Sequence, residues 1–116
     1  MMVAIMFALA APAWVPAGAG VEIDRSSLTW RNLQRVRWRA RRNSGEERHL
    51  DMVDCAAGLT AAIETVTLDG SGRVLNVARD GEALAAQRLS PATPGTIGET
   101  VAQEACRLRP PPPRRR

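Results

Sequence analysis

Apolar and polar residues alternate with a period of two along much of this chain, and this period is typical of β-strands with one buried face. The clearest case is the segment 33–42, in which Val36, Trp38 and Ala40 fall on one face. The other face receives only arginines, namely Arg35, Arg37, Arg39 and Arg41. A helix would not sort residues in this way, so the segment predicts a strand whose apolar side, including Trp38, faces the core.

The same pattern predicts further strands, separated by turns rich in Gly, Ser and Asp. The strands are expected at residues 14–15, 21–24, 47–55, 59–68 and 74–77, with turns at residues 24–27, 43–45, 69–72 and 80–81. The strand 47–55 would place three polar side chains on the face of Val53 and Cys55, and a bulge near Asp54 is one way to resolve this conflict. Residues 83–91 suit either a short helix or a loop.

A helix is predicted over residues 96–106. Thr96 and Glu99 have the spacing of a capping box, and Pro94-Gly95 stands just before it. Within the helix, apolar residues recur at i, i+4 and i+8, as Ile97, Val101 and Ala105. This stripe is narrow, and a narrow stripe is suited to packing against a sheet.

The elements together predict an α+β fold: an antiparallel β-sheet of about five or six strands with one C-terminal helix packed on one face, tied by a single disulfide. The chain has 2 cysteines, Cys55 and Cys106, so in an exported protein they can form an intramolecular bridge only with each other. The alternative is two buried free thiols in a reducing compartment.

The chain divides into three parts. Residues 1–21 carry no charge, and the apolar run 1–11 is too short for a membrane-spanning helix, which predicts an export signal over residues 1–13 with cleavage near Ala10 or Ala13. An uncleaved anchor is the alternative. Residues 14–107 form the predicted domain, without a membrane span after signal removal. Residues 108–116, rich in Pro and Arg, predict a disordered tail.

The charge balance is basic, with 16 cationic residues against 12 acidic ones, and every cation is Arg. A complete lack of Lys indicates a compositional bias of the whole chain. Each Arg is therefore weaker support for recognition of phosphate than it would be elsewhere. The expected compartment also argues against nucleic acid as a partner.

Two groups of residues have chemistry that a site could use. The arginines of segment 33–42 are the candidate binding surface for an acidic partner, although a solvated sheet face is the simpler interpretation. Glu47, His49 and Asp51 share one strand face and could converge on a metal ion, although a charged strand without a ligand is favoured. We predict no catalytic, cofactor or metal site, because no catalytic constellation can be assembled from these residues.

The order of these signals resembles the surface-adhesin protein E-like family of Gram-negative bacteria. The resemblance covers about residues 14–106 and is carried by Val53-Asp54-Cys55 and by the Pro94-Gly95-Thr96-Ile97-Gly98-Glu99 helix start that leads to Ala105-Cys106. It implies a small antiparallel sheet with a C-terminal helix held by the Cys55–Cys106 bridge. It also implies a binding protein rather than an enzyme; the best-known member is described as an adhesin for host matrix and serum proteins that can self-associate.

The sequence thus leads to two expectations about function. The first is a non-enzymatic periplasmic or secreted binding module, in the periplasm or on the outer surface of a Gram-negative bacterium, that binds an acidic protein, an envelope partner or host matrix through the Arg-rich sheet face. The alternative is a structural periplasmic accessory protein that forms a homodimer, or pairs with an envelope partner, through a sheet edge.

Overall fold

The computed structural model describes residues 11–42 and 44–114. Most of the predicted export signal, together with Asn43 of the predicted turn 43–45, lies outside the described residues. Within the described part of the chain, no helix is long and apolar enough to cross a membrane.

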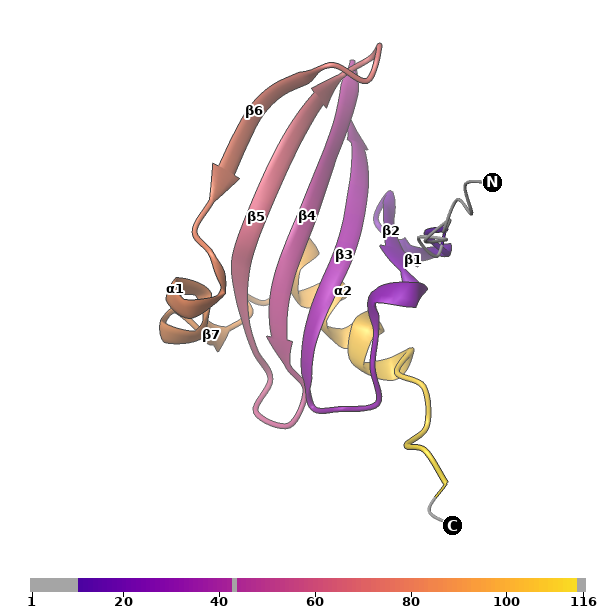
Figure 1. Cartoon of the computed structure of the whole chain (residues 1–116), viewed down its shortest axis with the longest axis vertical. Helices are drawn as coiled ribbons and strands as arrows, with labels where there is room; N and C mark the ends of the chain where they lie inside the picture. Colours follow the sequence, from indigo (N-terminus) through magenta and orange to yellow (C-terminus); the bar gives the residue numbers. More distant parts are fainter. Residues whose placement is uncertain (1–10, 43, 115–116) are drawn as a thin grey trace, which may run out of the picture.

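The described chain forms one antiparallel sheet that curls into a half-barrel (Figure 1). The strands are β1 (Trp14–Gly18), β2 (Val21–Asp24), β3 (Leu33–Arg42), β4 (Gly45–Asp54), β5 (Leu59–Asp69), β6 (Val74–Arg79) and β7 (Ser90–Pro91). The helices are the 3-10 turn η1 (Arg25–Ser27), α1 (Glu82–Gln87) and α2 (Ile97–Arg107). Strands β1 to β6 follow one another in order across the 7-stranded sheet, and β7 pairs with β5. The predicted antiparallel sheet with a C-terminal helix is therefore confirmed.

One local feature decides between two alternatives that the sequence left open, and two others differ from the prediction. Residues 83–91 fall within a short helix, α1, and a two-residue strand, β7. The irregularity in β4 lies between Leu50 and Asp51, where β5 has the extra residue Ile63, and not near Asp54. Strand β4 also ends before Cys55, which lies in the following turn and donates its N–H to the carbonyl oxygen of Asn32 at 2.9 Å. The predicted bulge position and strand end were thus wrong.

The alternation along β3 gives the sheet two distinct faces. Gln34, Val36, Trp38 and Ala40 are buried, whereas the arginines between them are exposed or half-buried. We call the side with Val36 the inner face and the side with the arginines the outer face. Because each residue opposite another in the ladder shares its face, the register extends these two faces over β2, β4 and β5.

The main core lies on the inner face. Its buried members are Ala17, Val21, Ile23, Leu28, Val36, Trp38, Ala40 and Val53, joined by Val101 and Ala105 of α2. In α2 the Thr96 hydroxyl accepts a hydrogen bond from the N–H of Glu99 at 3.3 Å, as the predicted cap requires. The Glu99 carboxylate reaches back to the N–H of Gly95 at 3.2 Å.

The predicted disulfide is confirmed. Cys55 and Cys106 are bonded, with their Cα atoms 5.6 Å apart and 51 positions apart in the sequence. Both cysteines pack against the main core. The bridge therefore fastens the C-terminal turn of α2 to the end of β4.

A second, smaller core lies on the outer face. Met52 and Ile63 are buried there together with Ala85 of α1. Helix α1 contacts β5 and β4, so it covers the end of the outer face at which the β5 bulge occurs. The rest of the outer face is left to the arginines of β3 and their neighbours.

Residues near both ends of the described chain contact the sheet and its loops. Near the N-terminus, Ala13 donates its N–H to the buried carboxylate of Asp24 at 2.9 Å, and its carbonyl oxygen accepts from the N–H of Arg25 at 2.8 Å. Beyond α2, Arg109 donates to the side-chain oxygen of Asn32 at 2.9 Å, and Leu108 packs against the main core. The first two residues of the predicted tail therefore still contact the body.

We predict that Cys106→Ser lowers the free energy of unfolding by about 2–4 kcal/mol in oxidising buffer, because the bridge restricts the unfolded chain over a long loop. Thermal and urea unfolding of variant and wild type measure the difference. The reduced wild type is the control and should match the variant. Equal stability of the variant and the oxidised wild type would contradict the prediction.

Candidate functional site

The four predicted arginines lie together on the outer face, but they are not equally free. Arg35 forms an ion pair with Glu82 of α1, and this contact raises the pKa of the Arg35 guanidinium. Arg39 lies 3.2 Å from the Glu22 carboxylate of β2 and 3.6 Å from that of Glu46. The charges of two of the four arginines, Arg35 and Arg39, are therefore neutralised by carboxylates of the same chain.

Aromatic stacking holds Arg39 further. Its guanidinium carbon lies 4.2 Å from the centre of the Trp14 ring, which is the geometry of a cation–π contact. Only 21% of the Arg39 side chain is exposed. Arg39 is therefore a structural part of the junction between β1, β2 and β3.

Arg37 and Arg41 differ from the other two. Among residues 11–42 and 44–114, no hydrogen-bond or ion-pair acceptor contacts either guanidinium, and both residues are exposed. The backbone N–H of Arg37 donates to the Ser27 hydroxyl at 3.1 Å, and this bond ties β3 to η1 at Arg37. The candidate binding surface is thus reduced from four arginines to two.

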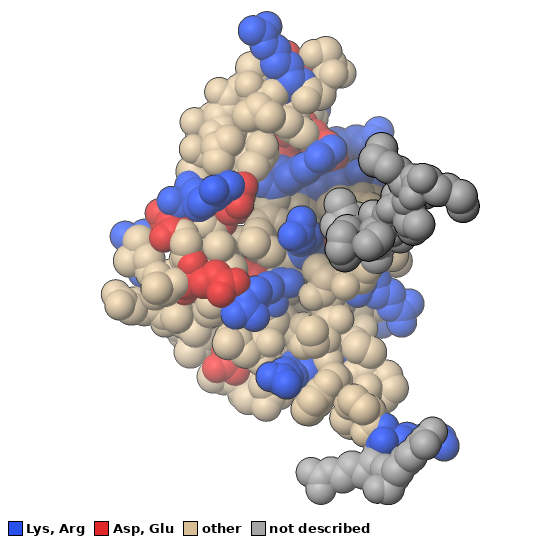
Figure 2. Space-filling view, in the orientation of Figure 1, with Lys and Arg blue, Asp and Glu red and all other residues tan. Residues whose placement is uncertain are grey.

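Neighbouring strands add further charges to the outer face. Arg48 of β4 pairs with Glu46 at 3.2 Å, and Arg79 of β6 pairs with Glu64 of β5 at 3.2 Å. In the view of Figure 2, blue and red groups lie side by side over the strands. The outer face therefore has a network of ion pairs. The sequence did not reveal this network, because most of the pairs join different elements.

A groove of about 260 Å³ lies beside Arg37, among these ion pairs. Its lining includes Trp14, Arg37, Arg48, Leu50, Glu64 and Val66. Trp14 comes from β1, whereas the other five lie on the outer faces of β3, β4 and β5. The lining also includes Trp38 and His49, whose side chains belong to the inner face. Of the six residues named first, only Arg37 was predicted for this face from the sequence, since the proximity of the other five depends on strand register.

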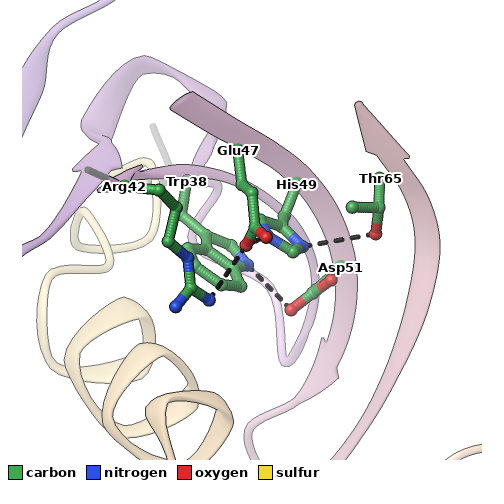
Figure 3. A network of polar contacts seen from close by, with 6 residues as sticks. All are labelled: Trp38, Arg42, Glu47, His49, Asp51 and Thr65. Atoms are coloured by element: carbon green, nitrogen blue, oxygen red, sulfur yellow. Dashed lines mark hydrogen bonds and ion pairs between the residues drawn. The ribbon is translucent and has the colours of Figure 1, made fainter. Parts of the chain in front are cut away.

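The inner face carries a polar network built around Trp38 (Figure 3). The Trp38 and His49 rings stack with centres 3.8 Å apart and planes 3° apart, because these residues lie directly opposite each other in β3 and β4. The Trp38 Nε1–H donates to the Asp51 Oδ2 at 2.8 Å. Trp38 is thus the core residue that was expected, and it also provides the hydrogen bond that the buried Asp51 needs.

His49 is held from both sides. Its Nε2 lies 3.3 Å from the Glu47 carboxylate, and its Nδ1 lies 3.3 Å from the Thr65 hydroxyl. Arg42 contacts the same Glu47 carboxylate at 3.1 Å. The polar side chains that the sequence placed on one strand face are therefore engaged with one another and with Trp38.

The two carboxyl groups of this network have opposite pKa shifts. Burial raises the pKa of Asp51, and the hydrogen bond from Trp38 offsets this only in part. Burial also acts to raise the pKa of Glu47, but hydrogen bonds from His49 and Arg42 outweigh it and hold that pKa below its ordinary value. In the described ranges, no group of three or more His, Cys, Asp or Glu side chains has an arrangement that could hold a metal ion.

We predict that Asp51→Asn changes the pH dependence of stability. Burial raises the folded-state pKa of Asp51 above the ordinary value of 3.8, so its proton favours folding below pH 3.8 and this contribution is lost as pH rises through the folded pKa. The unfolding free energy of the variant, relative to wild type, should therefore increase as pH rises. Urea unfolding between about pH 4 and pH 7 measures this, with the exposed Asp80→Asn as control. A difference that decreases with rising pH would contradict the assignment.

The comparisons with known proteins identify no relative. No protein-family model matches the chain, and neither a curated protein nor a solved structure is significantly similar to it.

Proposed function

We propose that this chain is a non-enzymatic binding module that binds an acidic region of a protein partner through the outer face of its sheet. The observation that carries the proposal is the exposure of Arg37 and Arg41 on a face where Arg35 and Arg39, the other two arginines, already form ion pairs. Two guanidinium groups without an acceptor among the described residues would gain charge-assisted hydrogen bonds from a partner's carboxylates. The single histidine is held in the Trp38 network, which supports a non-enzymatic role.

We further propose that the protein works in the periplasm or on the outer surface of a Gram-negative bacterium, as a member of the surface-adhesin protein E-like family. The disulfide supports this, because such bonds persist in oxidising compartments outside the cytoplasm. The burial of Val101 and Ala105 beside inner-face residues supports a fold in which α2 covers that face. This arrangement would leave the outer face available to partners.

A second candidate function is favoured by the open edge at β6. All six residues of β6 are exposed, and Val74, Leu75 and Val77 are 55%, 63% and 48% exposed. Edge strands are normally protected by charges, prolines or a covering element, and the segment 74–78 has none of these residues. We propose as the alternative that β6 pairs with β6 of a second copy, as a structural accessory protein would.

The opposite edge is less suited to pairing. Strand β1 contains Pro16, which has no backbone N–H to donate, and its register with β2 shifts between Pro16 and Gly18. The C-terminal residues 110–113 are all proline, so this segment cannot pair with β6 as a regular strand. A second copy of β6 is therefore the partner that the alternative favours.

We predict that Arg37→Glu combined with Arg41→Glu weakens binding to immobilised polyglutamate, a model acidic partner, by at least tenfold. Binding of the wild type should also weaken steeply as salt is raised, because exposed charges are screened. Biolayer interferometry at two salt concentrations measures both effects.

The matched control for this experiment is Arg73→Glu combined with Arg114→Glu. It changes the net charge by the same amount in the β5–β6 turn and the tail, and should bind nearly as the wild type does. Equal losses in both double variants would show a general charge effect and refute a site on the outer face.

We predict for the alternative that the wild type is a dimer at high concentration and that Leu75→Lys combined with Val77→Lys makes it monomeric. Two added charges on the edge strand would oppose strand pairing. Size-exclusion chromatography with light scattering measures the mass. Trp30→Lys, which removes another large exposed apolar side chain, is the control and should stay dimeric. A wild type that is monomeric at high concentration refutes edge pairing.

A further inference from the structure

The groove beside Arg37 combines charge and apolar surface in a regular pattern. Arg37 lies directly opposite Leu50 in the β3–β4 ladder, and Arg48 lies directly opposite Val66 in the β4–β5 ladder. Side chains opposite each other in this way are about 4.5–5.5 Å apart at Cβ. Each of two rows across the groove therefore places a cation beside an aliphatic side chain. The first row continues to Glu64, opposite Leu50, and the second to Arg39, opposite Arg48.

Arg37 is the charge in this groove that remains available. The Glu64 carboxylate is paired with Arg79 at 3.2 Å, and Arg48 is paired with Glu46 at 3.2 Å. Hydrogen bonds from Ser26 and Ala13, together with the nearby charge of Arg37, outweigh burial and lower the pKa of the Asp24 carboxylate. Arg37 lies near enough to Asp24 to affect its pKa, but within the described ranges it is the one of these groove charges whose side chain has no hydrogen bond or ion pair. Arg37 is therefore the group in the groove that could receive an anion.

The walls of the groove specify more than charge. Leu50 and Val66 are partly exposed, and the half-exposed Trp14 ring stands at the β1 side. A volume of about 260 Å³ is smaller than a drug-sized site of about 300–1,000 Å³ and suits a group the size of one residue. The ligand must therefore present its anion and a short apolar group close together.

We propose that this groove binds the C-terminal residue of a protein partner whose last side chain is aliphatic. A terminal residue carries its carboxylate and its side chain on the same Cα atom, so both fall within the short separation of Arg37 and Leu50. The guanidinium fork of Arg37 receives the carboxylate, and Leu50, Val66 and Trp14 contact the side chain. An internal acidic residue would need a second residue to supply the apolar contact. The inference rests on the proposed function, because it names one contact of the same outer face.

Fluorescence anisotropy with a fluorescein-labelled hexapeptide that ends in a free leucine carboxylate tests this proposal on the purified protein with its disulfide intact. The same peptide with a C-terminal amide should bind at least tenfold more weakly, because the carboxylate is lost. Arg37→Gln should weaken binding of the free-acid peptide by at least tenfold and remove the difference between the two peptides. Arg73→Gln, in the β5–β6 turn and outside both the groove and the proposed binding surface, is the matched control and should change binding less than twofold.

The outcomes separate this inference from the proposed function. Equal binding of the acid and amide peptides, or an unchanged affinity in Arg37→Gln, overturns the groove proposal, even if polyglutamate still binds the outer face. Peptide binding that depends on Arg37 supports the groove. This holds even if the double Glu variant still binds polyglutamate, a result that would refute the broader surface proposed for acidic partners. Circular dichroism of each variant confirms that a loss of binding is not a loss of fold.

Discussion

The strict alternation along β3 is the constraint on which the rest of the structure depends. It buries Gln34, Val36, Trp38 and Ala40 on one side, and it must therefore send four guanidinium groups to the other side at spacings of two residues. Like charges in such a row repel each other, so the neighbouring elements supply carboxylates. Glu22 of β2, Glu46 of β4 and Glu82 of α1 meet this need. One repeating pattern thus fixes the core and the charges around it.

The features that could be predicted from the sequence are those whose signals are local. Strand alternation, the Thr96 cap and a bridge between the chain's only two cysteines need no knowledge of distant neighbours. The position of the β5 bulge and the pairing of Arg35 with Glu82, 47 positions apart, depend on register and tertiary packing. The alternation therefore placed the four arginines together on one face, but which of them form ion pairs was not predictable.

The polar residues of β4 show why a local conflict can be resolved at a distance. Glu47, His49 and Asp51 stand on a core-facing side, which looked inconsistent when the strand was considered alone. Trp38 resolves the conflict, since its ring covers His49 and its N–H satisfies Asp51. With few aromatic residues in the chain, this one ring contributes both apolar area and a hydrogen-bond donor to the core.

The unequal edges of the sheet limit what the protein can build. An assembly grows without end when each copy offers two complementary edges, and it closes when only one edge can pair with itself. Here Pro16 interrupts the donor row of β1, whereas no strand of the described chain pairs with the outer edge of β6, which has exposed apolar side chains. Strand addition at β6 alone would consume that edge in the first contact. Association by this route would stop at two chains. Pro16 at the other edge would then prevent the growth of fibres, because it disfavours strand pairing there.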